Sequence, residues 1–411
     1  MKYLNSKKLL SVFLIAGMSV SMISGCGSSN KLTETEISKS PVSNPIVGNS
    51  STGDFLYGGD PSVLVDGDTV YLYTGHDASS DAEVNKAIYN IPEYLCYSSK
   101  DLITWNYEGS VMNMKDVSWG DKTSAWASQV AKHTDPETGK DKYYLYFCSW
   151  DKTSNGRQSI GVAVSDSPTG PFVDIGEPLV SGNVTKTNSS NWEDIDPTVW
   201  IDTDDEGVEH RYLAWGNACF FICELNEDMI SVKDITGNHE ITYGTDPVYD
   251  DIINKQSNLG SYTEAPWLYR KSDGNGGYTG DYYLFYASGW REGMSYATTD
   301  DLIYGKWMFG DAFMTPNATS NTNHMAVFDF QGETYMVYHD GALPGGNGYR
   351  RSACIAKLEF EDDGSVKMFE ESTAAIGGTV STIQTLNDEP ISHVSFNNPA
   401  SDTLYPFKGI V

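Results

Sequence analysis

The feature of this sequence that most restricts its fold is a strand pattern that recurs five times, at intervals of about 60 to 70 residues. Each copy opens on a polar or aromatic residue and continues as a short apolar strand. The opening residues are Asp60, Trp126, Asp196, Glu264 and His324. A turn rich in Asp and Gly follows, then an aromatic strand and a third strand, and several copies end on a fourth aromatic segment. No long segment shows a convincing helical period, so a helical repeat is disfavoured.

Four strands in each of five copies predict an all-β fold, a five-bladed β-propeller. The first strand of each blade lines the central axis of a propeller, so the five opening residues are expected to converge at one end of that axis. The propeller domain is predicted to span residues 53–411. Two possible strands in its tail, around 380–386 and 391–396, are expected to close the ring against the first blade.

Composition narrows the class of protein. The formal charge is −29 over 411 residues, which disfavours nucleic acid as a partner, because such partners require a basic face. The chain contains 26 Tyr, 15 Phe and 10 Trp. Most are expected in the β-core, because aromatic residues favour strands, and a few are expected to line a binding site. Apart from Cys26, the five cysteines are scattered and are interpreted as free thiols.

The N-terminus is predicted to be an export signal. Lys2, Lys7 and Lys8 precede an apolar run that is short for a membrane span, and Cys26 follows Ile-Ser-Gly in a site that resembles the bacterial lipobox. Residues 1–26 are therefore interpreted as a lipoprotein signal peptide, with Cys26 as the lipid anchor. Residues 27–52, rich in Ser, Thr, Asn and Pro, are interpreted as a flexible tether, and the protein as an exported cell-surface lipoprotein.

Three blade openings carry a carboxylate next to a proline. Asp60 and Asp196 directly precede Pro, and Glu264 precedes Ala-Pro. Proline is suited to the first residue of a strand, so each carboxylate is expected at a strand mouth. Two opposed carboxylates in a cleft are the minimum for glycoside hydrolysis, and a third can raise the pKa of the acid. A single Asp-Pro would more simply be a turn, as expected at Asp135 and Asp246. Three carboxylates at equivalent positions of the repeat are not explained in this way.

These motifs resemble those of glycoside hydrolase family 43, five-bladed propellers that cleave arabinose- and xylose-containing polysaccharides. The resemblance covers about residues 55–369. It is carried by the motifs Gly59-Asp60-Pro61, Asp194-Ile-Asp196-Pro197, Thr263-Glu264-Ala-Pro, Asn323-His324 and Gly348-Tyr-Arg350-Arg351.

The resemblance implies a role for each carboxylate. Asp60 would be the general base that activates water, Glu264 the general acid, and Asp196 the residue that keeps Glu264 protonated and oriented. The family inverts the anomeric centre, which requires the two main carboxyls to lie ~6.5–9.5 Å apart.

Further residues are expected near the substrate. Trp126 is predicted to stack on a sugar, with a core tryptophan as the alternative, and Trp290 to form a subsite wall. Neighbours in a strand point to opposite faces, so only one of Arg350 and Arg351 can face the pocket, and the resemblance favours Arg350. The resemblance requires no cofactor. It admits a structural calcium ion or a water cluster at His324, and a hydrogen-bonded axial histidine is the alternative.

The expected substrate is an arabinose- or xylose-containing polysaccharide or oligosaccharide. Removal of α-L-arabinofuranosyl groups from arabinoxylan is the first hypothesis, β-xylosidase activity the second and endo-arabinanase activity the third. A different class, an inactive glycan-binding propeller, is disfavoured because all three carboxylates are present. We expect a monomer that meets the membrane only through its lipid anchor.

Overall fold

The computed structural model describes residues 43–49, 55–135, 137–185, 190–234, 254–256, 259–317, 319–373 and 375–376. All of them belong to one compact unit, Leu32–Val411. The predicted signal peptide with Cys26, the tether up to residue 42 and the two predicted tail strands lie outside the described residues. Within the described ranges, no helix combines the length and the apolar character that a bilayer crossing needs.

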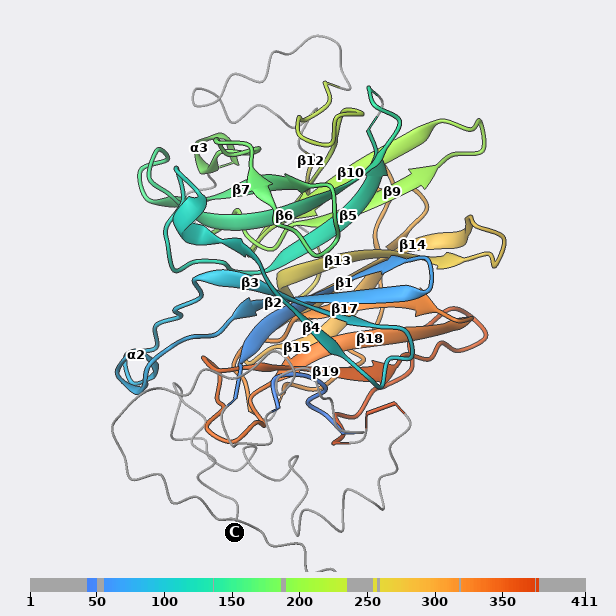
Figure 1. Cartoon of the computed structure of the whole chain (residues 1–411). Coiled ribbons are helices and arrows are strands. Elements are labelled where there is room, and N and C mark those ends of the chain that lie inside the picture. The colour runs from blue at the N-terminus through green and yellow to red at the C-terminus, as the bar shows by residue number, and fades with distance from the viewer. Residues whose placement is uncertain are drawn as a thin grey trace, which may run out of the picture. The chain divides into compact units, whose positions relative to one another are not determined.

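The described strands form five antiparallel sheets, each built from strands that follow one another in the chain (Figure 1). Blade 1 consists of β1 (Gly58–Asp66), β2 (Thr69–His76), β3 (Glu93–Ser99) and β4 (Asn106–Asn113). Blade 2 consists of β5 (Ser128–Thr134), β6 (Asp141–Asp151), β7 (Arg157–Ser165) and β8 (Val173–Asp174). Blade 3 consists of β9 (Thr198–Thr203), β10 (Glu209–Trp215), β11 (Phe220–Glu224) and β12 (Asn254–Gln256).

Blade 4 consists of β13 (Tyr262–Ser272), β14 (Tyr278–Ser288), β15 (Gly293–Thr299) and β16 (Met308–Phe309), and blade 5 of β17 (Met325–Phe330), β18 (Glu333–Asp340) and β19 (Ser352–Lys357). Short helical turns interrupt the loops: α2 (Asp81–Val84), η1 (Met114–Asp116) and α3 (Gly182–Thr185).

The aromatic strands form as the sequence predicts because each blade is covered on both faces. In β6, Tyr144, Tyr146 and Phe147 are all buried, although they do not all point to the same side of the sheet. A strand buried on both faces is apolar throughout rather than alternating. The polar turns join these strands tightly. Asp66 pairs with Thr69 across a two-residue turn in which Gly67 takes a positive φ of 63°, which glycine adopts without a steric penalty.

The first strands of the blades close a ring. β1 contacts β5 and β17, β9 contacts β5 and β13, and β13 contacts β17. Each inner strand therefore has an inner strand of a neighbouring blade on either side. The prediction of an all-β, five-bladed β-propeller is confirmed.

The predicted tether is too long at its C-terminal end, and residues 43–49 belong to the folded domain. Ile46 and Val47 are buried, and the Ile46 N–H donates to the carbonyl of Ala353 in β19 at 2.8 Å. The Asn44 side chain donates to the Ile355 carbonyl at 3.0 Å and accepts from the Ile355 N–H at 2.9 Å. These contacts satisfy backbone groups along β19 and bury two apolar side chains, which a flexible tether cannot do.

Candidate active site

A pocket of about 690 Å³ lies where the first strands of the blades begin. All five blade-opening residues line it, so the predicted convergence of these residues is confirmed. The predicted residues that line it are Asp60, Trp126, Asp196, Glu264, Trp290 and His324.

The backbone is left-handed just before the proline at three of the five openings. Asp60, Asp196 and Ala265 have φ of 51°, 59° and 56°. A following proline disfavours the ordinary helical region for these residues, and the left-handed conformation breaks the regular strand path. β1 and β13 each lose register with the next strand at this point. Such a bulge changes the direction of the neighbouring side chains, here those of Asp60 and Glu264.

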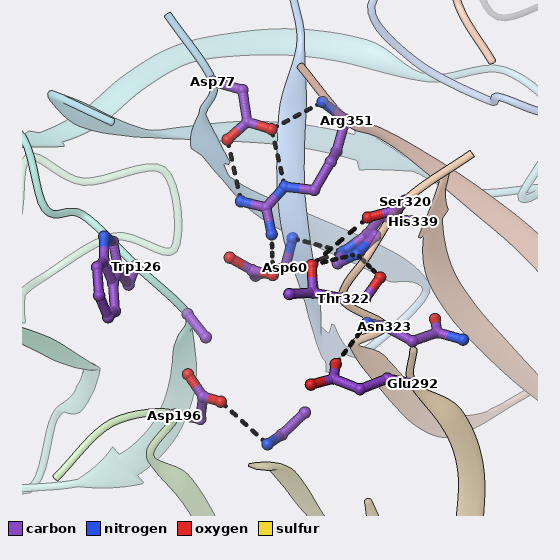
Figure 2. A network of polar contacts seen from close by, with 12 residues as sticks. Asp60, Asp77, Trp126, Asp196, Glu292, Ser320, Thr322, Asn323, His339 and Arg351 are labelled. Atoms are coloured by element: carbon purple, nitrogen blue, oxygen red, sulfur yellow. Dashed lines mark hydrogen bonds and ion pairs between the residues drawn. The ribbon is translucent and has the colours of Figure 1, made fainter. Parts of the chain in front are cut away.

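Asp60 is held in its ionised form by a buried arginine. Arg351 Nη1 donates to Asp60 Oδ1 at 2.6 Å (Figure 2). Burial by itself opposes the charge on Asp60, but the electrostatic contributions of its surroundings, led by Arg351, together outweigh burial, and the pKa of Asp60 lies below its ordinary value. A carboxylate in this state can accept a proton.

Arg351 is itself fixed by a second buried carboxylate. Its Nε and Nη2 donate to the two oxygens of Asp77 at 2.9 and 3.0 Å, a bidentate arrangement that sets the plane of the guanidinium (Figure 2). The guanidinium carbon lies 4.8 Å from the centre of the Tyr89 ring. The orientation of the group that binds Asp60 is thus determined on two sides.

The prediction that Arg350 faces the pocket is wrong. Arg350 Nε donates to the Ser79 carbonyl at 2.7 Å and Nη2 to Asp81 at 2.6 Å, and it is Arg351 that lines the pocket. The two side chains do diverge, as expected for neighbours in an extended segment. Asp77, which lies directly after β2, binds Arg351 and decides which of the two turns inward, and Asp77 was not among the predicted residues.

A neutral histidine supports the backbone of Asp60. His339 Nδ1 accepts the Asp60 N–H at 3.1 Å, and its Nε2 lies 2.9 Å from the Thr322 carbonyl, to which it donates. This pattern requires the neutral ring with its proton on Nε2. Burial lowers the pKa of His339 to about 3, in agreement with that state. His324, also buried, has its pKa lowered by burial to about 4.

Glu264 is buried, and its burial favours the protonated form. Burial raises the pKa of Glu264, although the Asn217 amide opposes this by donating to Oε2 at 2.7 Å. The Glu292 side chain also opposes the rise in pKa, whereas the negative charge of Asp60 adds to it. Glu264 can therefore supply a proton from the same pocket in which Asp60 can accept one.

Asp196 connects the blade 3 opening to the blade 4 opening. Its Oδ2 accepts the N–H of Ala265, the residue after Glu264, at 2.9 Å (Figure 2). Burial and then the nearby Glu264 raise the pKa of Asp196 well above its ordinary value. Asp196 thus fixes the backbone that carries Glu264 and is electrostatically coupled to it.

Aromatic side chains form the outer walls of the pocket. Trp290 is 73% exposed and available to a ligand. Trp126 is half-buried and packs edge-on against Trp150 with ring centres 5.8 Å apart, so it belongs in part to the core, as the alternative interpretation expected. Trp192, 45% exposed, lines the same pocket and was not predicted.

The described residues do not assign a metal to His324. No group of three or more His, Cys, Asp or Glu side chains within the described ranges is arranged to hold an ion. Calcium takes six to eight oxygen ligands, and a buried imidazole does not supply them. The five cysteines of the described chain carry no disulfide.

Sequence reasoning missed Asp77, Asn217, His339 and Glu292. The first three share a position: Asp77 and Asn217 follow β2 and β10, and His339 lies near the end of β18. The second strand of a blade runs antiparallel to the first, so its end lies beside the first strand's opening. A polar residue after the aromatic strand was the signal that could have found them.

A family model for glycosyl hydrolases family 43 matches residues 55–366, most of the chain. The chain belongs to glycosyl hydrolase family 43. Membership of this family makes the protein a glycoside hydrolase, with its candidate active site at the pocket described above.

Relatives in the family include proteins with several names. The chain is 28% identical over 342 residues to a xylosidase/arabinosidase of Bacteroides ovatus, which covers 77% of this chain and 96% of the relative. It is 31% identical over 290 residues to an Aspergillus niger protein named beta-D-galactofuranosidase, covering 66% of this chain and 72% of the relative. It is 27% identical to an arabinoxylan arabinofuranohydrolase of Paenibacillus polymyxa, covering 81% of this chain and 52% of the relative.

Solved structures of family 43 enzymes share the fold. One is a beta-xylosidase/alpha-arabinofuranosidase from a compost metagenome in complex with xylotriose, in a calcium-free form. It has a TM-score of 0.58 and 26% identity, covering 77% of this chain and 95% of that one. An alpha-L-arabinofuranosidase from Clostridium thermocellum has a TM-score of 0.57 and 28% identity, covering 78% of this chain and 94% of that one.

Proposed function

We propose that this glycoside hydrolase releases single pentose residues, α-L-arabinofuranosyl or β-D-xylosyl, from plant hemicellulose and inverts the anomeric centre. The observation that carries the proposal is the placement of two carboxyls with different partners in one pocket, Asp60 beside the Arg351 guanidinium and Glu264 beside the Asn217 amide. The names of the relatives, xylosidase/arabinosidase and arabinoxylan arabinofuranohydrolase, support the substrate class.

Asp60 acts as the general base in this proposal. A water molecule attacks the anomeric carbon, and its proton passes to the ionised Asp60 as the new C–O bond forms. Arg351 and His339 fix the side chain and the backbone of Asp60, respectively. Positioning of this kind is needed because general-base help depends on the proton lying within hydrogen-bond reach.

Glu264 acts as the general acid. It gives its proton to the glycosidic oxygen as the bond from that oxygen to the anomeric carbon breaks, and so avoids release of an unstable alkoxide. Asp196 serves as the modulator: it holds the backbone next to Glu264 and adds a carboxyl beside it. Two distinct carboxyl environments in one cleft are the usual way for a glycosidase to assign acid and base roles.

The experiment that tests the function measures sugar release from arabinoxylan, xylan and debranched arabinan, with the products identified by chromatography. Proton NMR of the first product anomer tests inversion. Release of arabinose or xylose monomers is the expected outcome, whereas arabinan oligomers would indicate an endo-arabinanase. A galactofuranoside substrate belongs in the panel because of the Aspergillus niger relative. Binding without any release would support the glycan-binding alternative.

Two substitutions test the roles. An activated aryl glycoside hardly needs an acid, whereas a sugar leaving group does. Glu264→Gln should therefore lose far more rate on arabinoxylan than on an aryl arabinofuranoside or xyloside. Asp60→Asn should be impaired on both substrates, by ~10²–10⁴-fold, because both need the activated water. A substrate-dependent loss in Asp60→Asn with a uniform loss in Glu264→Gln would reverse the roles.

We further propose that the enzyme is exported and anchored through a lipid on Cys26. The lipobox-like Ile-Ser-Gly-Cys after the apolar N-terminal run supports this location. A polymeric substrate outside the cell is consistent with it.

A further inference from the structure

Asn217 places a side-chain amide against the proposed acid. It follows β10, the second strand of blade 3, and lines the pocket. Its Nδ2 donates to Oε2 of Glu264 at 2.7 Å. In a protonated carboxyl the carbonyl oxygen is the better acceptor, so a donor at Oε2 favours the proton on the other oxygen, Oε1. The contact therefore distinguishes the two oxygens of the acid.

The turn that carries Asn217 is fixed by backbone hydrogen bonds to the segment before β9. The Gly216 N–H donates to the carbonyl of Ile195 at 2.9 Å, and the Asn217 N–H donates to that of Glu193 at 3.0 Å. Glu193 is 1% exposed, and its side chain pairs with Arg157 of β7 at 3.0 Å. The position of the amide is thus set by a buried framework and does not depend on its contact with the acid.

The two residues that flank Glu264 are bonded to the same blade. The carbonyl of Thr263 accepts the N–H of Ala218 at 2.7 Å, and Ala265 donates its N–H to Asp196 at 2.9 Å (Figure 2). Ala218 lies in the turn after β10, and Asp196 lies before β9. Blade 3 therefore fixes both the backbone of Glu264 and the amide that contacts its side chain.

We propose that Asn217 is a positioning residue for the acid: it holds Oε2 of Glu264 as an acceptor and leaves the transferable proton on Oε1, from which it passes to the glycosidic oxygen. This inference rests on the proposed role of Glu264 as general acid and makes that role more specific. Without the amide, the proton would be distributed over both oxygens, and only one of the two arrangements would be productive.

The same hydrogen bond assists the transfer of the proton. The proton leaves Oε1 for the glycosidic oxygen as the bond from that oxygen to the anomeric carbon breaks, and Glu264 becomes negative. Hydrogen bonds to ionised groups are stronger than those to neutral groups, so the bond from Asn217 strengthens during this step. Solvent then returns a proton to Glu264, and the proton of the attacking water leaves through Asp60, so the proton balance closes.

The amide also influences the pKa of the acid. Burial raises the pKa of Glu264, and the hydrogen bond from Asn217 opposes that rise. The carboxyl, imidazole and guanidinium groups that share the pocket with Glu264 are Asp60, Asp121, Asp196, Glu292, His324 and Arg351. Of these, Asp60 raises the pKa of the acid, whereas Glu292 and Arg351 lower it. A substitution at Asn217 leaves all of these groups in place, so loss of the amide should raise the pKa of Glu264.

The test replaces Asn217 with alanine in the full-length protein and measures kcat/KM on aryl arabinofuranosides or xylosides whose leaving groups span a range of basicity. A well-placed proton matters most for a poor leaving group. The rate on poor leaving groups should fall by ~10–100-fold, and that on an activated nitrophenol by less than ~3-fold. Activity is lost as pH rises through the pKa of the acid, so the basic limb should move to higher pH, by about 0.5–1 unit.

Asn226→Ala is the matched control. Asn226 is half-buried and follows β11 of the same blade, where its amide donates to Ser231 Oγ at 2.8 Å and to the Val232 carbonyl at 3.2 Å. This variant loses an amide of the same kind without touching Glu264. It should leave both the leaving-group dependence and the basic limb unchanged. Equal effects in the two variants would overturn the proposal, because a general loss of order in blade 3 would then explain them.

Asn217→Asp keeps the shape of the side chain and removes the donor. An ionised aspartate can only accept, so it would draw the proton of Glu264 to Oε2. The rate on poor leaving groups should therefore fall at least as far as in Asn217→Ala, and a wild-type leaving-group dependence would overturn the proposal. So would a basic limb that moves to lower pH in Asn217→Ala, because the amide carbonyl would then be the group that faces Glu264 and accepts its proton.

Glu264→Ala separates a failure of this inference from a failure of the proposed function. If Asn217 acts through Glu264, Asn217→Ala should cause no further loss in the Glu264→Ala background. A further loss of the same size there would overturn the inference, while impairment of Glu264→Ala on poor leaving groups would leave Glu264 as the acid. If Glu264→Ala matches the wild type on those substrates, the proposed acid itself is wrong.

Discussion

At the scale of single residues, the carboxyls of the proposed base and the proposed acid differ because their neighbours differ. Asp60 lies against the guanidinium of Arg351, whereas Glu264 accepts a hydrogen bond from the neutral amide of Asn217. Both are deeply set in the same pocket, so burial alone would move both pKa values upward. The surroundings of Asp60, led by Arg351, reverse that direction, whereas the pKa of Glu264 stays raised. The proposed assignment of base and acid therefore follows from the partners that each carboxyl meets.

The adjacent arginines offer a matched test. Arg351→Lys keeps a positive charge but cannot bind Asp60 and Asp77 together, because an ammonium lacks the planar fork. The pKa of Asp60 should rise, so the acidic limb of kcat/KM should move to higher pH. Misplacement of the base should lower kcat/KM by about 10²-fold near the optimum. The measurement is a pH profile on an aryl glycoside.

Arg350→Lys is the control for that experiment. Arg350 binds Asp81, whose side chain is 89% exposed, and the Ser79 carbonyl, so the same substitution should leave the profile close to that of the wild type. Equal losses in the two variants would mean that the inward position of Arg351 is not what supports Asp60.

At the scale of elements, the openings of the strands determine where the chemistry lies. The sequence predicts these openings well, because a carboxylate next to a proline recurs in phase with the strands. It also predicts the five aromatic strands, since a strand buried on both faces must be apolar throughout. The sequence does not predict Asp77 as the partner of Arg351 or Asn217 as the partner of Glu264, because each meets its target only after distant segments pack together. The choice between Arg350 and Arg351 fails for the same reason.

Composition also failed to predict that residues 43–49 pack against the propeller. Its residues resemble the polar run before them, yet Ile46 is 1% exposed beside β19. Replacing Ile46 with alanine should lower the free energy of unfolding by about 2–5 kcal/mol, because a cavity remains in the core. Urea unfolding followed by tryptophan fluorescence measures this.

The control is Val173→Ala, at a side chain that is 68% exposed, which should change stability by less than ~0.5 kcal/mol. If the two substitutions have equally small effects, the contacts of residues 43–49 with β19 do not stabilise the propeller.

At the scale of the whole molecule, the site exists only when the ring is closed. The proposed base comes from blade 1, its arginine from the segment before the last strand of blade 5, and the proposed acid from blade 4. The inner strands contact one another in sequence around the axis, which brings residues roughly 200 to 300 positions apart into one pocket. Packing between blades therefore supports catalysis as well as stability, and a lesion far from the pocket can still displace the carboxyls.

The N-terminal prediction concerns the molecule's place in the cell rather than its fold. If Cys26 carries the lipid, Cys26→Ser should move the protein out of the membrane fraction, and it should no longer incorporate an alkyne-labelled fatty acid. The kcat/KM of the purified protein should not change, because Cys26 precedes every described residue of the propeller. Ser28→Ala, two residues further along, is the control and should remain membrane-bound and labelled. Membrane association that persists in Cys26→Ser would mean that something other than this cysteine holds the enzyme there.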